Sequence, residues 1–210
     1  MSNLSVRKLG GFALIVGPIL TLLAYQLTPG VFNDFTAVGN HIAVQAQATG
    51  SMAEFSGLLL AVAFLVMLFG FNSLNDRVRG GNGEALCRLG ILSIGVGILL
   101  WIAGSALYLA ISKIGFEALG PNAAHAGLVG LGEIAFAAGV VVAGLGLTTR
   151  DDFNKIATWF FVAAGVLSLI LNIFTSQLGL DAEIHGILIS ITYIIWVVWA
   201  VIAGLSQIKD

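Results

Sequence analysis

The chain has 210 residues, of which 58% are hydrophobic and only 10% are charged, whereas a soluble domain contains about 25% charged residues. This composition is typical of a polytopic membrane protein and leaves little chain for a soluble domain, and the lack of a basic stripe or patch argues against nucleic-acid binding. The formal net charge is −2, and the single cysteine, Cys87, excludes an internal disulfide and any multi-cysteine metal motif.

Six runs of the chain are apolar over the length of about 20 residues that a membrane-spanning helix needs. We predict spans at residues 9–27, 52–73, 89–112, 123–147, 156–175 and 184–206. The first run follows two basic residues, as in a signal peptide, but has no clear small-residue cleavage site, so it is predicted to be a retained span. The predicted fold is all-α: a six-helix transmembrane bundle that forms one membrane domain over residues 1–210.

The placement of the basic residues predicts the orientation of the bundle. With six spans both termini lie on one side, and this side carries every Lys and Arg except Lys113. Cytoplasmic loops of membrane proteins are enriched in Lys and Arg. We therefore predict a multi-pass protein of the cell membrane with both termini in the cytoplasm, and with outer segments at residues 28–51, 113–122 and 176–183.

The six spans also read as three helical hairpins that resemble one another. The fourth and sixth spans align so that His125 matches His185 and Glu133 matches Tyr193. In a second alignment Glu54 matches Glu133. Internal duplication is one interpretation and chance similarity between apolar helices is the other. Repeats matter because membrane proteins often place a binding site at the repeat interface near the midplane.

Small residues predict where neighbouring spans approach closely. Ala135, Gly139 and Ala143 recur every four positions on one face of the fourth span, and such a face lets two helix backbones come together. The third span carries a comparable set of glycines: Gly90, Gly95, Gly97 and Gly104.

Glu133 is the most informative residue, because it lies inside the apolar run 123–147. A carboxylate in hydrocarbon costs at least a few kcal/mol, so such a residue is a functional-site hypothesis by default. With the helix starting at an N-cap formed by Asn122, Glu133 is expected near the bilayer centre. Its functional interpretation is a proton carrier, cation ligand or substrate anchor. The structural interpretation is a neutral carboxyl that holds helices together.

Glu54 is the second candidate carboxylate. It lies three residues after Ser51, which is the spacing of a capping box at the start of a helix. A role beside Glu133 is the alternative. Two further polar groups lie within spans: Tyr193, which can hydrogen-bond to Glu133, and the amide of Asn172, which can complete a cavity.

Three histidines fall on the outer side of the predicted topology: His41, His125 and His185. His125 and His185 each begin a helix that returns to the cytoplasm, so they are expected at a similar depth. Imidazoles from two helices at one depth can ligate a haem iron, and three can ligate zinc or copper. An interfacial or helix-capping role is the alternative, and the sequence leaves the cofactor unknown.

No enzyme motif is present. The chain lacks a phosphate-binding Walker loop, a dinucleotide fingerprint, a nucleophile elbow and the HExxH zinc motif. The predicted loops are short and leave little room for a soluble catalytic apparatus. We therefore predict that the protein is not an enzyme.

Three short motifs resemble a known family. They are the RKLG run before the first span (7–10), the MAE run at the start of the second (52–54), and Arg88 before the third. The family is an uncharacterised bacterial and archaeal group of six-helix integral membrane proteins, described as a domain of unknown function. The resemblance implies the six-helix fold and no established activity.

The sequence leaves three functional hypotheses. In the first, a small solute, ion or proton is bound or transported through an outward-facing polar site anchored by Glu133 and Glu54 and lined by His125, His185 and Tyr193. In the second, the chain is an accessory or structural subunit of a larger membrane complex. In the third, it is a redox subunit that carries haem or a metal on its histidines. Membrane lipid is the expected partner, with other membrane subunits or a second copy of the chain as further candidates.

Overall fold

The computed structural model describes residues 5–29, 50–114 and 119–209. Every regular element in these residues is an α-helix, so the all-α prediction is confirmed. The helices are α1 (Val6–Gln26), α3 (Ser51–Val78), α4 (Glu84–Ile114), α5 (Leu119–Thr148), α6 (Lys155–Leu178) and α7 (Ala182–Lys209).

All six helices are long and apolar enough to cross a membrane. Most of them extend several residues beyond the predicted spans, for example to Val78 at the end of α3 and back to Glu84 at the start of α4. An apolar run in the sequence covers only the part of a helix that lies in hydrocarbon, whereas the backbone hydrogen bonds of the helix continue into the polar interface. The sequence therefore predicted the number of helices well and their ends less well.

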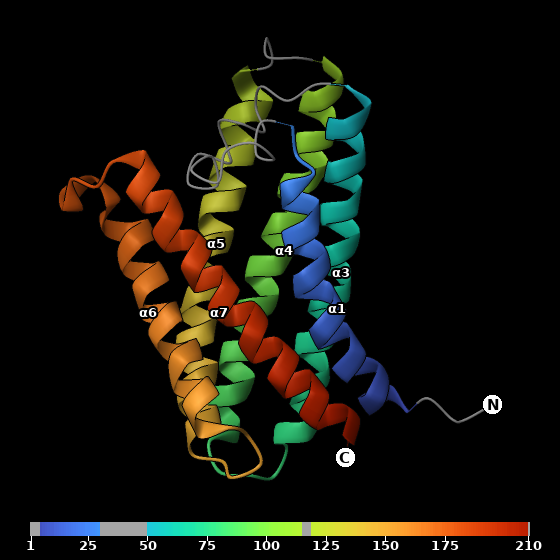
Figure 1. Ribbon diagram of the computed structural model, residues 1–210, viewed down its shortest axis with the longest axis vertical. Helices are drawn as coiled ribbons and strands as arrows, with labels where there is room; N and C mark the ends of the chain where they lie inside the picture. Colours follow the sequence, from blue (N-terminus) through green and yellow to red (C-terminus); the bar gives the residue numbers. More distant parts are fainter. Residues whose placement is uncertain (1–4, 30–49, 115–118, 210) are drawn as a thin grey trace.

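The helices form a closed ring in chain order. Each helix packs against the one before and the one after it, and α7 returns to pack against α1. Successive helices run in opposite directions, so the start of α1 and the end of α7 lie at the same end of the bundle (Figure 1). We call this the terminal end and the opposite end the distal end. The two helices of each predicted hairpin pack against each other, while the duplication of the hairpins stays a prediction.

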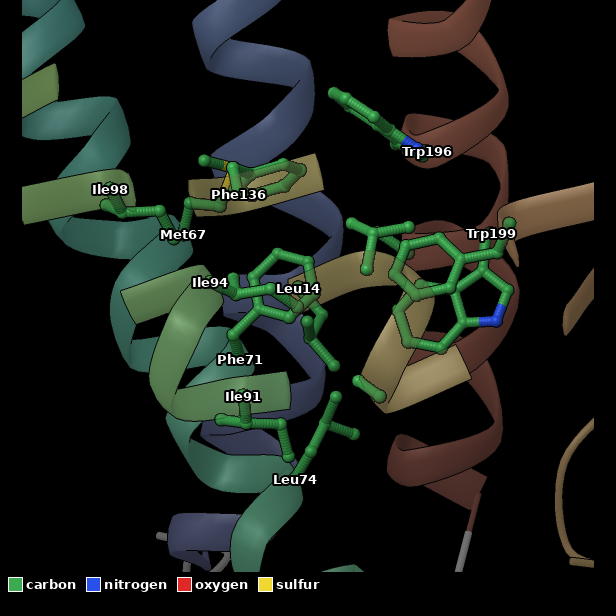
Figure 2. Close-up of a cluster of buried hydrophobic side chains, with 14 of the residues drawn as sticks. Leu14, Met67, Phe71, Leu74, Ile91, Ile94, Ile98, Phe136, Trp196 and Trp199 are labelled. Atoms are coloured by element: carbon green, nitrogen blue, oxygen red, sulfur yellow. The ribbon is translucent and has the colours of Figure 1, made fainter. Parts of the chain in front are cut away.

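Aliphatic and aromatic side chains fill the centre of the ring (Figure 2), and the aromatic rings among them form a cluster. Phe136 of α5 lies at the middle of this cluster. Its ring centroid is 4.8 Å from that of Trp101, 4.9 Å from that of Trp196 and 5.8 Å from that of Phe71. Each such pair stabilises the fold by about 0.5–1.5 kcal/mol beyond the area it buries. One residue of α5 therefore connects α3, α4 and α7.

Small residues bring α4 and α5 together, as predicted. A Cβ atom on Gly139 would lie 2.5 Å from the backbone nitrogen of Ile94, and Gly90 faces Ala143 as closely. Gly95 differs, because its nearest neighbour is Leu68 of α3. The glycines of α4 therefore face two different helices, α5 and α3.

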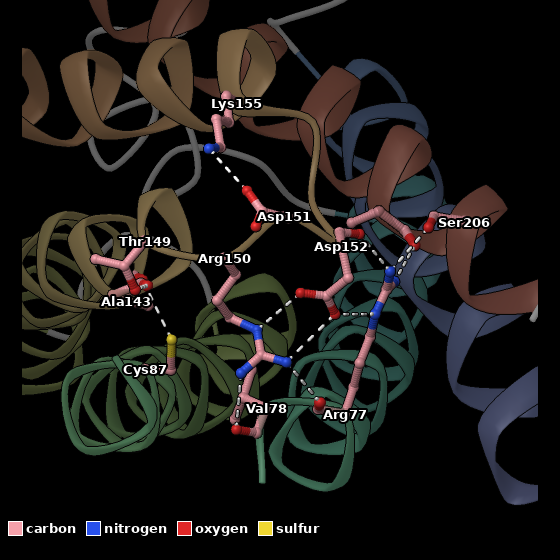
Figure 3. A network of polar contacts seen from close by, with 12 residues as sticks. Arg77, Val78, Cys87, Ala143, Thr149, Arg150, Asp151, Asp152, Lys155 and Ser206 are labelled. Carbon is pink, nitrogen blue, oxygen red and sulfur yellow. Dashed lines mark hydrogen bonds and ion pairs between the residues drawn. The ribbon is translucent and has the colours of Figure 1, made fainter. Parts of the chain in front are cut away.

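A polar network closes the terminal end of the bundle (Figure 3). The Arg77 side chain is only 3% exposed and pairs with Asp152, which Arg150 also contacts. Arg77 Nη2 also donates to the Asp152 carbonyl at 2.7 Å and to Ser206 Oγ at 2.8 Å. The nearby exposed pair of Lys155 with Asp151 holds the pKa of Asp151 below its usual value.

Two predicted helix caps are wrong. Gly50 is the N-cap of α3, with a φ of +90° that favours glycine, so Ser51 is already helical and does not form a capping box with Glu54. α5 begins at Leu119, so Asn122 lies inside the helix. Pro121 does not prevent this earlier start, because a missing N–H costs nothing in the first turn of a helix.

Candidate functional site

A cavity of about 120 Å³ lies between the middle of the bundle and its distal end. Every helix except α6 contributes to its wall. The lining residues are Leu22, Tyr25, Gln26, Phe64, Trp101, Glu133, Ile189, Ser190, Tyr193 and Ile194. This volume holds several water molecules or a small organic group.

Glu133 lies at the middle of α5 and lines this cavity. Its position on the helix explains its direction. It precedes the fully buried Phe136 and Ala137 by three and four residues, and positions with this spacing share one face of a helix. The carboxyl group therefore faces the inside of the ring, where the cost of placing it in hydrocarbon is avoided.

Two tyrosines bring hydroxyl groups to the same cavity. Tyr25 comes from the last turn of α1 and Tyr193 from α7. The Tyr193 hydroxyl donates to the carbonyl oxygen of Pro18 at 3.3 Å. A phenol has one proton to donate, so Tyr193 does not also donate it to Glu133. Tyr193 thus lines the same cavity as Glu133, while its hydrogen bond goes to α1.

A second, smaller cavity of about 10 Å³ adjoins the first and shares Tyr25, Phe64 and Trp101 with it. This volume is about the least that can hold one water molecule. Its polar lining includes Ser105 and His125. His125 is buried, and its Nδ1–H donates to the carbonyl oxygen of Gly104 at 2.9 Å. That bond fixes the ring against α4.

Other predicted site residues lie outside these two cavities. Glu54 is partly exposed in the first turn of α3 and lines neither of them. Asn172 of α6 donates to the carbonyl oxygen of Ser168 at 2.9 Å, within its own helix. His185, in the first turn of α7, also lines neither cavity. His41 lies outside the described residues.

Of the two described histidines, only His125 lines one of these cavities. Among residues 5–29, 50–114 and 119–209, no group of three or more His, Cys, Asp or Glu side chains is placed to hold a metal ion. The haem and metal hypotheses therefore gain no support here and stay untested, since His41 is not described.

Sequence reasoning missed several residues of the cavity, chiefly Tyr25, Gln26, Phe64 and Trp101. Tyr25 and Gln26 are adjacent residues with polar side-chain groups at the end of an otherwise apolar span, and this pattern could have identified them as site residues. No sequence pattern identifies Phe64 and Trp101 as site residues, because an aromatic residue in a span is more often a packing residue.

Comparison of the chain with protein-family models, with curated proteins and with solved structures finds no match. The resemblance to an uncharacterised six-helix family is therefore not supported beyond the six membrane helices themselves.

Proposed function

We propose that this integral membrane protein binds or transports a small solute, ion or proton in the cavity beside Glu133. The observation that supports the proposal most is the position of the carboxyl group. It comes from the middle of a membrane-spanning helix and lines an internal cavity. Ionisable groups in membrane spans are typical of substrate and ion pathways.

The chemical character of the cavity agrees with this role. Most of the wall is apolar, and a few polar side chains converge on it: Tyr25, Gln26, Glu133, Ser190 and Tyr193. Small-molecule sites are mostly apolar pockets in which a few polar groups fix the orientation of the ligand. A carboxyl that only holds helices together does not require an open space beside it.

The cavity also lies where an outward-facing site is expected. We propose that the terminal end faces the cytoplasm, because the basic residues gather there, and that the cavity opens toward the outside of the cell. Asp181 at the distal end and Arg79 at the terminal end are both exposed. Labelling of cysteines at these two positions with an impermeant reagent distinguishes the two orientations.

The Glu133→Gln variant tests the proposed function. The wild type, purified in dodecyl maltoside, is screened by thermal unfolding against small organic cations, organic anions and neutral solutes. At a concentration of about 100 times Kd, a ligand stabilises the folded state by about 2.7 kcal/mol. We expect at least one class to raise the unfolding midpoint of the wild type, and the rise to be largely lost in Glu133→Gln.

Glu54→Gln is the matched control, because Glu54 is a carboxyl in α3 that does not line the cavity. It should respond to the ligand as the wild type does. An equal rise of the unfolding midpoint in Glu133→Gln and in the wild type would contradict the proposal. Unchanged binding together with constant copurification of other subunits is the result that the accessory-subunit hypothesis predicts, and a Soret absorption band is the result that the haem hypothesis predicts.

A further inference from the structure

We propose that the cavity beside Glu133 binds an organic cation, with its ammonium group between the carboxyl and the surrounding aromatic rings and an apolar tail directed between α1 and α7. This inference rests on the proposed function and names the class of its ligand. Three independent features of the molecule support it.

The first feature is the set of aromatic rings around the carboxyl. Four of the lining residues besides Glu133 carry aromatic rings: Tyr25, Phe64, Trp101 and Tyr193. The faces of such rings attract cations, and the attraction is stronger where water is excluded. Aromatic cages of this kind recognise quaternary ammonium groups. A carboxylate beside them adds a full opposite charge, whereas an anionic ligand would meet repulsion from the same group.

The second feature is the charge of the distal end. Among the described residues, the charged ones at this end are Glu54, Lys113, Asp181 and Glu183, which give a formal charge of −2. A surface of one sign raises the local concentration of oppositely charged solutes and speeds their association. Cations are therefore favoured on the route to the cavity.

The third feature is the apolar wall between α1 and α7. Leu22 of α1 and Ile189 and Ile194 of α7 line the cavity. Ile194 is also 50% exposed, so the apolar lining continues onto the surface of this membrane-spanning helix. A ligand with a hydrocarbon or benzyl group can bury that group along this wall while its charged group reaches Glu133.

The same wall disfavours a bare metal ion. Ca²⁺ takes six to eight oxygen ligands and Mg²⁺ keeps most of its water. The cavity has one carboxyl, two phenols, one amide and one hydroxyl on an otherwise apolar wall. Within the described residues no cluster of metal-ligating side chains is present. An organic cation needs only one counter-charge and aromatic or apolar contact for the rest of its surface.

Isothermal titration calorimetry with benzyltrimethylammonium tests the inference. The full chain is placed in phosphatidylglycerol nanodiscs and titrated with this cation and with its neutral carbon isostere, neopentylbenzene. We expect the wild type to bind the cation at least about tenfold more tightly than the isostere, because only the cation gains from the carboxylate and the rings. Glu133→Gln should lose at least about tenfold in affinity for the cation and keep its affinity for the isostere. Glu54→Gln should lose far less affinity for the cation than Glu133→Gln, because Glu54 contributes only to the charge of the distal end and does not line the cavity.

A second arm identifies the source of the cation. The titration is repeated in nanodiscs that contain phosphatidylcholine, whose headgroup carries the same trimethylammonium group. Competition by this lipid assigns the site to a lipid headgroup, and unchanged affinity assigns it to a free amphiphilic cation. Both results support a cation site.

Two results would overturn the inference. One is equal binding of the cation and the isostere by the wild type, and the other is full cation affinity in Glu133→Gln. If an anion or a neutral solute instead binds the wild type and depends on Glu133, the proposed function survives and the cation inference alone fails. If no solute class depends on Glu133, both fail.

Discussion

Replacing Arg77 by alanine is expected to destabilise the protein by about 2–4 kcal/mol, which corresponds to a fall in the thermal midpoint of roughly 5–15 °C. Arg77 lies in the last turn of α3 with its side chain almost fully buried. Its guanidinium contacts Asp152 and Ser206 and lies 4.2 Å from the centroid of the Phe153 ring. The substitution therefore removes one group that connects α3, the α5–α6 loop and α7.

Arg79 provides the matched control for this measurement. It lies two residues further along the chain, is 71% exposed, and pairs only with the equally exposed Asp76 among the contacts the structure gives it. Exposed ion pairs contribute about 0–1 kcal/mol. Thermal unfolding of Arg79→Ala should therefore differ little from that of the wild type. Equal midpoints for the Arg77 and Arg79 variants would contradict the structural role of the network.

Replacing Gly97 by alanine is expected to destabilise the bundle by about 1–3 kcal/mol. A Cβ atom at this position would lie 2.7 Å from both the carbonyl oxygen of Gly132 and the backbone nitrogen of Phe136. Both contacts are with backbone, which cannot rotate away as a flexible side chain does. The α4–α5 pair must then separate at the level of Phe136, where the aromatic cluster is centred.

Gly95→Ala is the control, since it makes the same chemical change one half-turn away. Its Cβ atom would meet only Leu68 Cδ1, at 3.5 Å, which is an ordinary contact. Alanine is favoured over glycine inside a helix by about 0.5–1 kcal/mol. Thermal midpoints should therefore fall for Gly97→Ala and stay equal or rise for Gly95→Ala. A fall of the same size in both would show that the packing of α4 differs from the one described.

The helices were predictable from sequence because the bilayer imposes a simple rule on length and polarity. Glu133 stood out for the same reason, because it lies in the middle of an apolar run, whereas Glu54 lies at the start of one. The hairpin connectivity followed from the number of spans. The starts of α3 and α5 were less predictable. Gly50 is the N-cap of α3 and α5 begins at Leu119, whereas the nearby Ser51 and Asn122 are the residue types that favour an N-cap.

The composition of the site was less predictable, because it depends on which helices meet. Asn172 is as polar as the site residues, but it lies on α6, which does not line the cavity. Tyr25 belongs to the site because α1, at 21 residues the shortest of the described helices, ends beside the cavity. Figure 1 shows α1 ending below the distal ends of α3 and α4. Arg77 was expected in a loop, and only the contact of α3 with the α5–α6 loop makes it a buried residue.

The most direct test of the central claim is whether a solute from outside the cell reaches the cavity beside Glu133. A cysteine is placed at Ser190, in a Cys87→Ala background that has no other thiol. Intact cells are treated with the impermeant reagent 2-(trimethylammonium)ethyl methanethiosulfonate, with Asp181→Cys and Arg79→Cys as positions at the two ends. We predict that the cysteines at positions 190 and 181 are modified and that the one at position 79 is not. A cysteine at position 190 that stays unmodified in intact and in permeabilised cells, while position 181 reacts, would contradict the claim.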